Sequence, residues 1–543
     1  MLKLLLSNKH RGGAVYLWVI LITSLNFLSG VALHAKGTGI FDVYDYGAGG
    51  DGRTLDTQAI QAAIDDCTQK GGGKVCLHNG KFLSGTLFLK NDVTLYLEAG
   101  ATLLGSTNLG DYPVTVPAYR SYTDKYTDKS LIYAERVENI GLAGQGAIDG
   151  QGGAFKGKWK KRPYCIRVVE CKNVRVEGIR LTNSPMWMQH YLACDKVVVR
   201  GITVYNHCNK NNDMIDIDGC RDVIISDCIG DTDDDGLTLK STSSRACANV
   251  TITNCILSSH CNALKMGTES SGGFKNITIS NCVIRPSQCA KVIYGARNGV
   301  AGVALMMVDG GILEGITISN ISIADITNPL FLRLGNRGRK YKQDMETPGV
   351  GKFCKVKISN VIATGAGDMG LAVFGIPGHP IEDISLNNIQ IIYKGGGTSE
   401  QTFRNIPEKE KKYPEAMMFG TLPAYGFFVR HAKNIKFHNV TLGFEKADHR
   451  PALMFDDVQE LDIFGFEAQS TPETHALIWL KQVSDAFIHG CRPQKTETVF
   501  INISGEKSRN ITITNNDFSR VKQSLRIDKQ VNEASIFCNN NRK

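Results

Sequence analysis

A short sequence pattern of alternating apolar residues recurs along the chain and constrains its fold more than any other feature. Each copy begins with a small or apolar residue, continues with two polar residues and then alternates apolar and polar positions. Such alternation is typical of a short β-strand with one buried face. The copies begin at Cys171, Cys194, Cys220, Cys247 and Phe274, and near Leu313, Phe353, Ile381, Ala432, Val458, Val483 and Ser508.

The spacing of the copies selects one repeat architecture. The first five starts are separated by 23 to 27 residues, which is too short for a propeller blade, and no helical pattern follows the strands. This period fits one coil of a parallel β-helix, in which about three short strands pair with those of the coils above and below. We therefore predict an all-β chain that forms a right-handed parallel β-helix over residues 36–543.

One segment near the N-terminus reads as a helix that caps the solenoid. An open end of a β-helix exposes unpaired strand edges and an apolar core. Residues 57–69 have apolar side chains spaced along one helical face, Asp56 is the expected N-cap, and the glycine run 71–73 ends the helix. A further segment, 396–424, is rich in Lys, Glu and Pro and is predicted to be a loop inserted into a coil, of the kind that shapes a binding groove.

The chain has 16 cysteines, many of which recur at the repeat period. We expect Cys171, Cys194, Cys220 and Cys247 to form one column of the solenoid, and Cys228, Cys255 and Cys282 another. Residues stacked on neighbouring coils lie near the strand spacing of about 4.8 Å, beyond the usual Cβ separation of a disulfide. Most of these thiols are therefore predicted to be free and buried, with Cys67–Cys76 and Cys491–Cys538 left as candidate bridges.

Residues 1–35 read as a signal peptide. A basic start with Lys3, Lys9 and Arg11 precedes an apolar stretch and small residues near Ala32 and Ala35. A single membrane anchor is the alternative, but polar residues interrupt the stretch and no basic cluster follows it. We expect a periplasmic or secreted protein with no membrane attachment after cleavage.

The net charge of the chain limits the chemical classes of ligand that it is expected to bind. Removal of the three basic leader residues lowers the formal charge from +9 to about +6, which suits an acidic substrate. The sequence has no block of Lys and Arg, so nucleic acid is not an expected partner.

The densest run of acids indicates where chemistry takes place. Asp213 follows Asn211 and Asn212, and the run Asp231–Gly236 comes one coil later; Asp213 and Asp234 are 21 residues apart. This spacing places both segments side by side on adjacent coils. Carboxylates held this close raise the pKa of at least one member, and glycoside hydrolysis needs a protonated acid beside an ionised one.

Two other interpretations of these acids remain open. Asp231–Gly236 matches the first half of an EF-hand loop, including its glycine, although the twelfth position is Thr242 and no helices flank it. Aspartates also mark turns between strands, as Asp218 and Asp222 are expected to do. A double line of acids on adjacent coils is poorly explained by turns alone, because their repulsion is costly.

Several motifs together resemble glycoside hydrolase family 28, the polygalacturonase and rhamnogalacturonan hydrolase family. They are the segment from Phe41 to Ala48, the cap at 51–60, Gly144–Gly150, Asn183–His190 and the acid cluster. The likeness covers most of the mature chain and implies a pectin-lyase-like solenoid that cleaves an acidic plant polysaccharide with inversion, without metal or cofactor.

The resemblance also assigns roles to the acids. The Asn-x-Asp motif of the family falls on Asn211–Asp213, and its Asp-Asp pair falls on Asp234 and Asp235. Carried over, Asp234 is the general acid, whereas Asp213 and Asp235 hold the attacking water. Inverting enzymes keep their acid and base about 6.5–9.5 Å apart to admit that water.

Two departures concern the substrate. Asn262 stands where polygalacturonases have the histidine of Gly-His-Gly, and Ala304-Leu305-Met306 replaces the Arg-Ile-Lys motif that grips a uronate carboxylate. Both losses resemble the rhamnogalacturonan hydrolase branch. Replacement cations are sought in Lys265, Arg297, Arg333 and Arg337, the last two in the basic, glycine-rich loop at 330–339.

The remaining candidates for substrate binding each have a plainer alternative. Asn211 is taken from the family motif. His190 and His260 either face the groove or serve as hydrogen-bonded structural residues, and Lys240 either tunes Asp235 or points to solvent. Tyr294 is either a platform for a sugar ring or a core residue.

Three functions are thus compared. The first is an inverting, pectin-directed glycoside hydrolase acting as a monomer. The second is a pectate-lyase-like enzyme on the same fold, which needs calcium and a basic catalytic residue. The third is a non-catalytic carbohydrate-binding β-helix, although its concentrated acids would repel an acidic glycan. We favour the hydrolase.

Overall fold

The computed structural model describes residues 39–494 and 496–542, so the predicted signal peptide lies outside the described residues. Residues Phe41–Lys543 form one compact unit, and a second unit, Met1–Ile40, contributes only Gly39 and Ile40 to the description. No helix in the described parts of the chain is long and apolar enough to cross a membrane.

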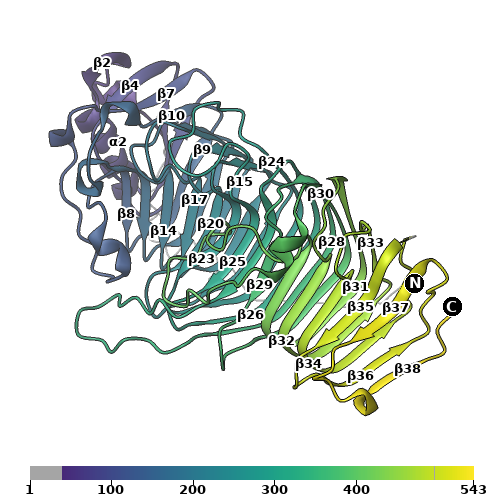
Figure 1. The fold of residues 1–543 in the computed structure, drawn as a ribbon. Coiled ribbons are helices and arrows are strands. Elements are labelled where there is room, and N and C mark those ends of the chain that lie inside the picture. The colour runs from purple at the N-terminus through teal and green to yellow at the C-terminus, as the bar shows by residue number, and fades with distance from the viewer. Residues whose placement is uncertain (1–38, 495, 543) are drawn as a thin grey trace, which may run out of the picture. The chain divides into compact units, whose positions relative to one another are not determined.

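The larger unit is a parallel β-helix, as the repeat predicts. Its strands stack side by side in chain order, each pairing in parallel with the equivalent strand of the next coil (Figure 1). Three ladders run along the solenoid, and the longer strands after β23 bend from one ladder into the next.

The first ladder carries the strands that matter for the site. Its members are β5 (Leu87–Phe88), β8 (Ser130–Glu135), β11 (Tyr164–Val169), β14 (Gln189–Leu192), β17 (Ile215–Asp218), β20 (Leu237–Ser241), β23 (Asn262–Ser270), β25 (Ala301–Met307), β27 (Asn328–Leu334), β29 (Leu371–Phe374), the first parts of β31 (Phe427–Lys446), β32 (Leu453–Phe464) and β34 (Ile478–His489), then β35 (Thr496–Ser504) and β37 (Val521–Ile527).

The second and third ladders complete each coil. The second contains β3 (Gly73–Leu77), β6 (Val93–Leu97), β9 (Glu138–Gly144), β12 (Lys172–Glu177), β15 (Asp195–Arg200), β18 (Arg221–Ser226), β21 (Cys247–Thr253), β24 (Phe274–Arg285), β26 (Ile312–Ala324), β28 (Lys352–Ala366), β30 (Ile381–Gly395), parts of β31, β32 and β34, then β36 (Arg509–Thr514) and β38 (Ile536–Asn539). The third contains β2 (Asp51–Leu55), β4 (Gly80–Ser84), β7 (Ala101–Gly105), β10 (Ala147–Asp149), β13 (Arg180–Thr182), β16 (Thr203–Asn206), β19 (Ile229–Thr232), β22 (Ile256–Ser259), the ends of β24, β26, β28, β30 and β31, then β33 (Glu467–Ala468).

Helical structure is confined to one α-helix and short 3-10 turns within the described residues. The helix, α2 (Thr57–Gln69), lies where the sequence predicts it and buries Ile60, Ala63, Ile64 and Cys67. Asp56 is its N-cap residue, but the carboxylate accepts hydrogen bonds from the amides of Gly49 and Gly50 instead of a helix amide. The remaining elements are β1 (Ile40–Asp42) and the 3-10 turns η1 (Val43–Tyr46), η2 (Leu109–Asp111), η3 (Tyr122–Lys125), η4 (Gly152–Ala154), η5 (Trp159–Lys161), η6 (Ser399–Phe403) and η7 (Glu533–Ser535).

The register confirms the columns read from the repeat. Cys247 pairs with Phe274, Phe274 with Leu313 and Leu313 with Phe353. The same inward column continues through Ile381, Ala432, Val458 and Val483. The two cysteine columns lie in this core, and all 16 cysteines of the sequence are free thiols, so neither candidate bridge forms.

An asparagine ladder explains the polar position inside the repeat. Its side chains hydrogen-bond from coil to coil at 3.0 to 3.2 Å. Each of these residues has a φ between 52° and 57°, the left-handed region that Asn tolerates better than other residues with a side chain. The asparagines thus both bend the strand and tie the coils together. The ladder consists of Asn281, Asn320, Asn360, Asn388 and Asn439.

Substitution of Asn360 separates these two contributions. Asn360→Gly keeps the left-handed backbone but loses both ladder bonds, and we expect it to lower the free energy of unfolding by about 1 kcal/mol. Asn360→Ala also strains the backbone, which costs about 1–2 kcal/mol more. Denaturant midpoints of the two variants measure the difference, and equal destabilisation would contradict the backbone argument.

Candidate active site

The predicted acids converge outside the first ladder because neighbouring coils are in register. Ile215 pairs with Leu237 and Leu237 with Leu264, so the residues two positions earlier, Asp213, Asp235 and Asn262, form a column. Amide hydrogen bonds from Met214 to Asp235 and from Gly236 to Asn262 extend this register to the strand ends. The offset between coils is therefore 22 residues (235 − 213), and Asp235 is the acid directly beside Asp213.

Gly236 permits the close approach of these coils. A Cβ added there would lie 2.5 Å from the carbonyl oxygen of Ala263, closer than any side chain tolerates. The glycine after the Asp-Asp pair therefore reflects packing between β20 and β23, and it brings Asp235 within reach of side chains on the next coil.

Asp235 is held by two donors on β23. Lys265 Nζ donates to Asp235 Oδ2 at 2.6 Å, and Asn262 Nδ2 donates to Asp235 Oδ1 at 2.7 Å. Asn262, the residue found in place of the family histidine, thus orients this carboxylate. Its own Oδ1 is buried without a hydrogen-bond partner.

Asp234 has the environment of a general acid. Its Oδ1 accepts a hydrogen bond from the amide of Asp235 at 2.9 Å. Burial and the neighbouring charge of Asp235 raise its pKa to about 6, and this rise prevails over the opposing effects of Lys265 and Lys240. A carboxyl group with this pKa carries a proton under mildly acidic conditions.

Asp213 and Asp216 are the most desolvated acids of the cluster. Burial, Asp216 and Asp234 raise the pKa of Asp213 well above its usual value, and its Oδ1 has no hydrogen-bond partner. Burial also raises the pKa of Asp216 to about 7, although Lys240 Nζ lies 3.3 Å from its carboxylate. The cluster therefore shares protons among several carboxyl groups.

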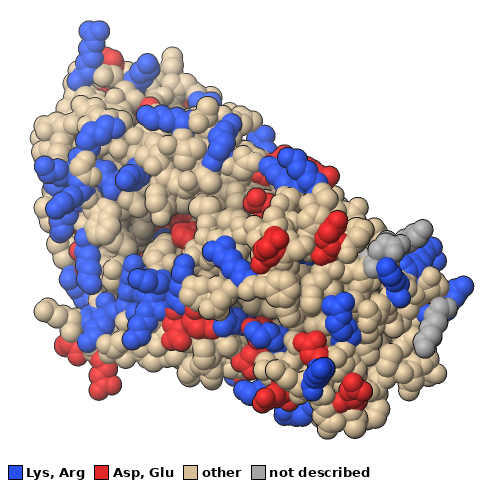
Figure 2. Space-filling model, viewed as in Figure 1, with Lys and Arg blue, Asp and Glu red and all other residues tan. Residues whose placement is uncertain are grey.

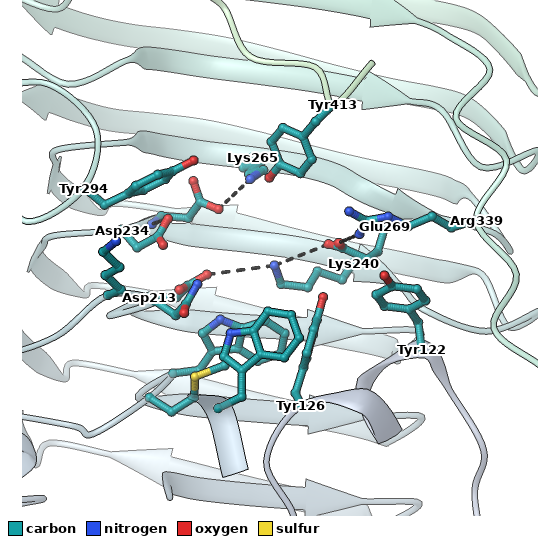
Figure 3. A pocket seen from close by; sticks show the side chains of 16 residues that line it. Tyr122, Tyr126, Asp213, Asp234, Lys240, Lys265, Glu269, Tyr294, Arg339 and Tyr413 are labelled. Carbon is teal, nitrogen blue, oxygen red and sulfur yellow. Dashed lines mark hydrogen bonds and ion pairs between the residues drawn. The ribbon is translucent and has the colours of Figure 1, made fainter. Parts of the chain in front are cut away.

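Opposite charges continue in a row across the cavity floor. Lys240 lies between Asp213 at 3.9 Å and Glu269 at 3.6 Å, and Arg339 contacts Glu269 at 2.8 Å (Figure 3). Lys240, Arg337 and Arg339 outweigh the effect of burial and lower the pKa of Glu269 to about 2. Lys240 also lies 4.5 Å above the ring of Trp187.

Aromatic side chains form the walls of this cavity, which has a volume of about 340 Å³. Tyr126 contacts the rings of Trp159 and Trp187, with centroids 4.7 and 5.4 Å apart. Tyr294 and Tyr413 line the other side and face the acids (Figure 3). Lys and Arg side chains also gather on the visible surface over the N-terminal and middle coils (Figure 2). A ring-lined cavity with lysines and arginines suits an acidic sugar.

The structure brings seven of the candidate residues to the cavity. They are Asn211, Asp213, Asp234, Asp235, Lys240, Lys265 and Tyr294. Asn262 lies directly behind them as a partner of Asp235, and Asn211 Oδ1 accepts a hydrogen bond from Arg162. Lys240 points into the acid cluster and not to solvent.

Both candidate histidines have structural positions and not positions on the groove. His190 is fully buried, where its Nε2 lies 3.1 Å from Asp218 and its ring packs against Trp187. His260 is also buried, held between Asp233 at 2.9 Å and the carbonyl of Cys289 at 3.0 Å. Of the two alternatives, the geometry thus favours the hydrogen-bonded structural role for both histidines, since neither lines the cavity.

Two candidate arginines are likewise used elsewhere. Arg297 donates to the carbonyls of Ser287 and Cys289. Arg333 is buried, donates to the carbonyls of Gly375 and Glu408 and lies over the ring of Phe419, where it fixes the inserted segment. Neither replaces the missing uronate grip. The basic loop at 330–339 supplies Arg339 to the cavity instead.

The acids of Asp231–Gly236 do not converge on one ion as in an EF-hand loop. Asp231 binds His207 at 2.9 Å, and Asp233 accepts from His260 and from the amides of Ile293 and Tyr294, whereas Asp234 and Asp235 face the cavity. Two groups of possible metal ligands have their ligand atoms within 4.8 Å of one another in the described residues: His207, Asp233 and His260, and Asp234, Asp235 and Cys261. In the first group, hydrogen bonds within the group and to neighbouring residues already occupy most of the ligand atoms.

Several residues that line the cavity or lie beside it, Glu269 and Tyr413 among the former and Asp216 and Glu415 among the latter, were not among the predicted site residues. Asp216 was visible in the alternation of β17, since Ile215 and Ile217 point inward. Glu269 is on β23, the strand that bears Lys265. Tyr413 and Glu415 come from the insertion, for which sequence spacing gives no signal; burial raises the pKa of Glu415 to about 7, against the effect of Lys265.

Comparisons with known proteins agree with this geometry. The chain is 33% identical over 214 residues to a probable polygalacturonase of Vitis vinifera, covering 36% of this chain and 43% of that protein. It is 34% identical over 200 residues to an exo-poly-alpha-D-galacturonosidase of Dickeya chrysanthemi, covering 35% and 31%. The matches thus span less than half the length of either relative. Both are named for galacturonan, so the rhamnogalacturonan-type branch is not shown.

The fold and the family are shown by two further matches. An exopolygalacturonase from Thermotoga maritima has the same fold, with a TM-score of 0.55, 22% sequence identity and coverage of 65% of this chain and 87% of that chain. The model of "Glycosyl hydrolases family 28" matches residues 67–412. This span includes the acid column, the cavity residues Lys240, Lys265 and Arg339, and the chain belongs to glycosyl hydrolases family 28.

Proposed function

We propose that the protein hydrolyses galacturonate-containing pectic chains by an inverting acid/base mechanism. The observation that carries the proposal is the column of Asp213 and Asp235 beside Asp234, in a cavity lined by lysine, arginine and aromatic rings. The relatives named as polygalacturonases support the same substrate class.

The arrangement divides the chemical work among the acids. Asp234, whose pKa is raised to about 6, donates its proton to the glycosidic oxygen as the bond breaks. Asp235, fixed by Lys265 and Asn262, accepts the proton of a water molecule that Asp213 helps to hold, as the water attacks the anomeric carbon. A hydrolase of this kind leaves a saturated product, which distinguishes it from a lyase.

Positive side chains in the cavity provide the recognition of a uronate. Lys240, Lys265 and Arg339 are present although the Arg-Ile-Lys motif is missing. The residues at that motif, Ala304 and Met306, are buried in an apolar cluster with Phe419 and Leu422 of the insertion. The cavity thus takes its cations from β20, β23 and the 330–339 loop.

Rhamnogalacturonan is the second candidate substrate. It is favoured by Asn262 in place of histidine and by the loss of the arginine-lysine grip, which reduces the number of cations available to consecutive uronates. Incubation with polygalacturonate, rhamnogalacturonan and oligomers of each, followed by identification of the products, separates these substrates.

We also propose that the protein acts outside the cytoplasm, after removal of residues 1–35. The basic start and apolar stretch of this segment support export. N-terminal sequencing of the mature protein from its native host tests the proposal, and a mature chain that still starts at Met1 would contradict it.

Asp234→Asn removes the proposed acid. We expect kcat on polygalacturonate to fall at least about 100-fold, the usual contribution of general acid catalysis, with an unchanged melting temperature. Asp222→Asn, an exposed residue of β18 on the neighbouring coil and not the turn residue that the sequence predicts, is the matched control and should keep full activity. NMR of the first product should show an inverted anomer; near-normal turnover by Asp234→Asn would refute the assignment.

Lys240→Met tests the electrostatic tuning of Asp234. The ammonium group of Lys240 lowers the pKa of Asp234, so its removal should raise that pKa. Because Asp234 must be protonated to act as the acid, the activity of the parent enzyme is present below a pH of about 6 and is lost above it. In the Lys240→Met variant, the pH above which kcat/KM falls should therefore be higher. Lys275→Met is the surface control. Glu415→Gln should not change the pH at which kcat/KM falls on the alkaline side. If this variant loses the fall in kcat/KM, the titrating group is Glu415 and not Asp234.

Arg339→Gln tests recognition of the acidic sugar. We expect the KM for polygalacturonate to rise about tenfold, equivalent to about 1.4 kcal/mol of lost binding, because the arginine at the cavity no longer offers a charge. Arg175→Gln, an exposed residue that pairs only with Glu177, should keep the parent KM. An unaltered KM in Arg339→Gln would exclude a contact with the uronate.

A further inference from the structure

The outward face of the first ladder continues well beyond the acid cluster. The column that begins with Lys265 pairs with Ala304 and then Phe331, and farther along Phe428 pairs with Met454 and Met454 with Trp479. Trp479 lies on β34, six strands after β23 in this ladder. At a strand spacing of about 4.8 Å, it is about 29 Å from Lys265 along the sheet.

The insertion at 396–424 covers the middle of this face. Ile406, Phe419 and Leu422 pack with Phe331 and Phe428 of the ladder in one buried apolar cluster. In Figure 1 the green insertion crosses in front of the strands near β29. One part of it brings Tyr413 to the catalytic cavity, and another part brings residues 402–406 to a second hollow.

This second hollow has a volume of about 280 Å³ and an aromatic wall. The ring centroid of Phe403 lies 5.6 Å from that of Trp479, and His475 lies 4.8 Å from Trp479. Phe403 is 62% exposed, so its ring is accessible from solvent. The indole of Trp479 is fixed, because its Nε1 donates to Ser504 Oγ at 2.8 Å.

Cations line the same hollow. Lys481 contacts Asp456 at 3.2 Å, and its side chain is 44% exposed. Arg430 donates to the carbonyl of Ile406 at 2.7 Å and pairs with Glu408 through its Nη2, while its Nε is buried without a hydrogen-bond partner, 3.9 Å from Asp456. Arg404 donates one hydrogen bond, to the carbonyl of Thr421. Donors on Arg404 and Lys481 thus remain available beside the exposed ring.

We propose that this second hollow, lined by Phe403, Trp479, Arg404, Arg430 and Lys481, binds uronate residues of an acidic oligosaccharide. The faces of pyranose rings pack on aromatic side chains, and carboxylates pair with Arg and Lys. The ligand class rests on the proposed function, because the hollow lies on the same sheet face as the acid cluster. The site holds a distant stretch of the polysaccharide on the C-terminal coils. Arg430, Trp479 and Lys481 lie beyond the family match at 67–412, and the insertion residues Phe403 and Arg404 lie within it.

The tryptophans allow the two sites to be observed separately. Trp159 and Trp187 line the catalytic cavity and Trp479 lines the second hollow, while the fourth, Trp18, is in the predicted signal peptide. Mature Asp234→Asn protein labelled with 5-fluorotryptophan should give three resonances in a 19F NMR spectrum, which single Trp→Phe variants assign. Titration with oligogalacturonates should shift the Trp479 resonance saturably, and neutral galacto-oligosaccharides should not.

Substitutions test which side chains form the second site. Phe403→Ala and Lys481→Gln should each weaken the affinity read at Trp479 about tenfold, a loss of about 1.4 kcal/mol, and leave the titration of Trp159 and Trp187 unchanged. Phe487→Ala is the matched control, since Phe487 is also an exposed ring on β34 but stacks on His489 outside the hollow.

The outcomes separate this site from the proposed function. If Trp479 does not shift while Trp159 and Trp187 do, or if neutral sugars shift Trp479 equally, the second site is refuted and the catalytic proposal stands. If Trp479 alone shifts and the parent enzyme hydrolyses no galacturonan, the second site is supported and the proposed function fails. A Trp479 shift that Phe403→Ala and Lys481→Gln do not weaken also refutes the second site.

Discussion

The register between parallel coils is the constraint on which the rest of the molecule depends. One strand pairing, Ile215 with Leu237, places Asp213 beside Asp235, and the next places Asp235 beside Asn262. A slip of one residue would turn these side chains from the surface to the core. The inward column of apolar residues opposes such a slip in every coil, and the asparagine ladder fixes the bend at the far end of the same strands. The geometry of the acids is therefore a property of the whole solenoid.

Charge balance decides whether such a cluster can exist. Burial of a carboxylate without a partner is costly, and here Lys240 and Lys265 are buried among the acids as counter-charges. The balance is incomplete, because oxygens of Asp213, Asp216 and Glu415 lack hydrogen-bond partners within the described chain. Burial raises the pKa values of these three carboxyl groups, and their unpaired oxygens are free to interact with a ligand. The buried polar groups that lower the folding stability of the ligand-free protein are thus the groups that we propose to contact water and sugar.

Sequence reasoning reaches the fold and the acid column but not the surroundings of the site. The repeat predicts the inward column from Cys171 to Ser508, since burial enforces both its spacing and its composition. Asp213, Asp234 and Asp235 follow from the same period. The spacing of the repeat does not record which residues cover an outward side chain. Trp187 and Asp218 contact His190, and Asp233 and the carbonyl of Cys289 contact His260, so both histidines are buried away from the cavity. Arg333 was misplaced because its partners, Gly375 and Glu408, belong to later coils and the insertion.

The insertion shows how a solenoid changes its binding surface without changing its core. Each coil contacts only its neighbours, so a loop that leaves one coil and packs on the sheet face need not alter the register. Here the insertion covers Ala304 and Met306, the positions where a uronate grip was expected, with Phe419 and Leu422. An arginine-lysine motif at those positions would be buried without partners under this cover. The loss of the motif therefore suits the presence of the insertion, and the cations that line a hollow lie at either end of the covered region.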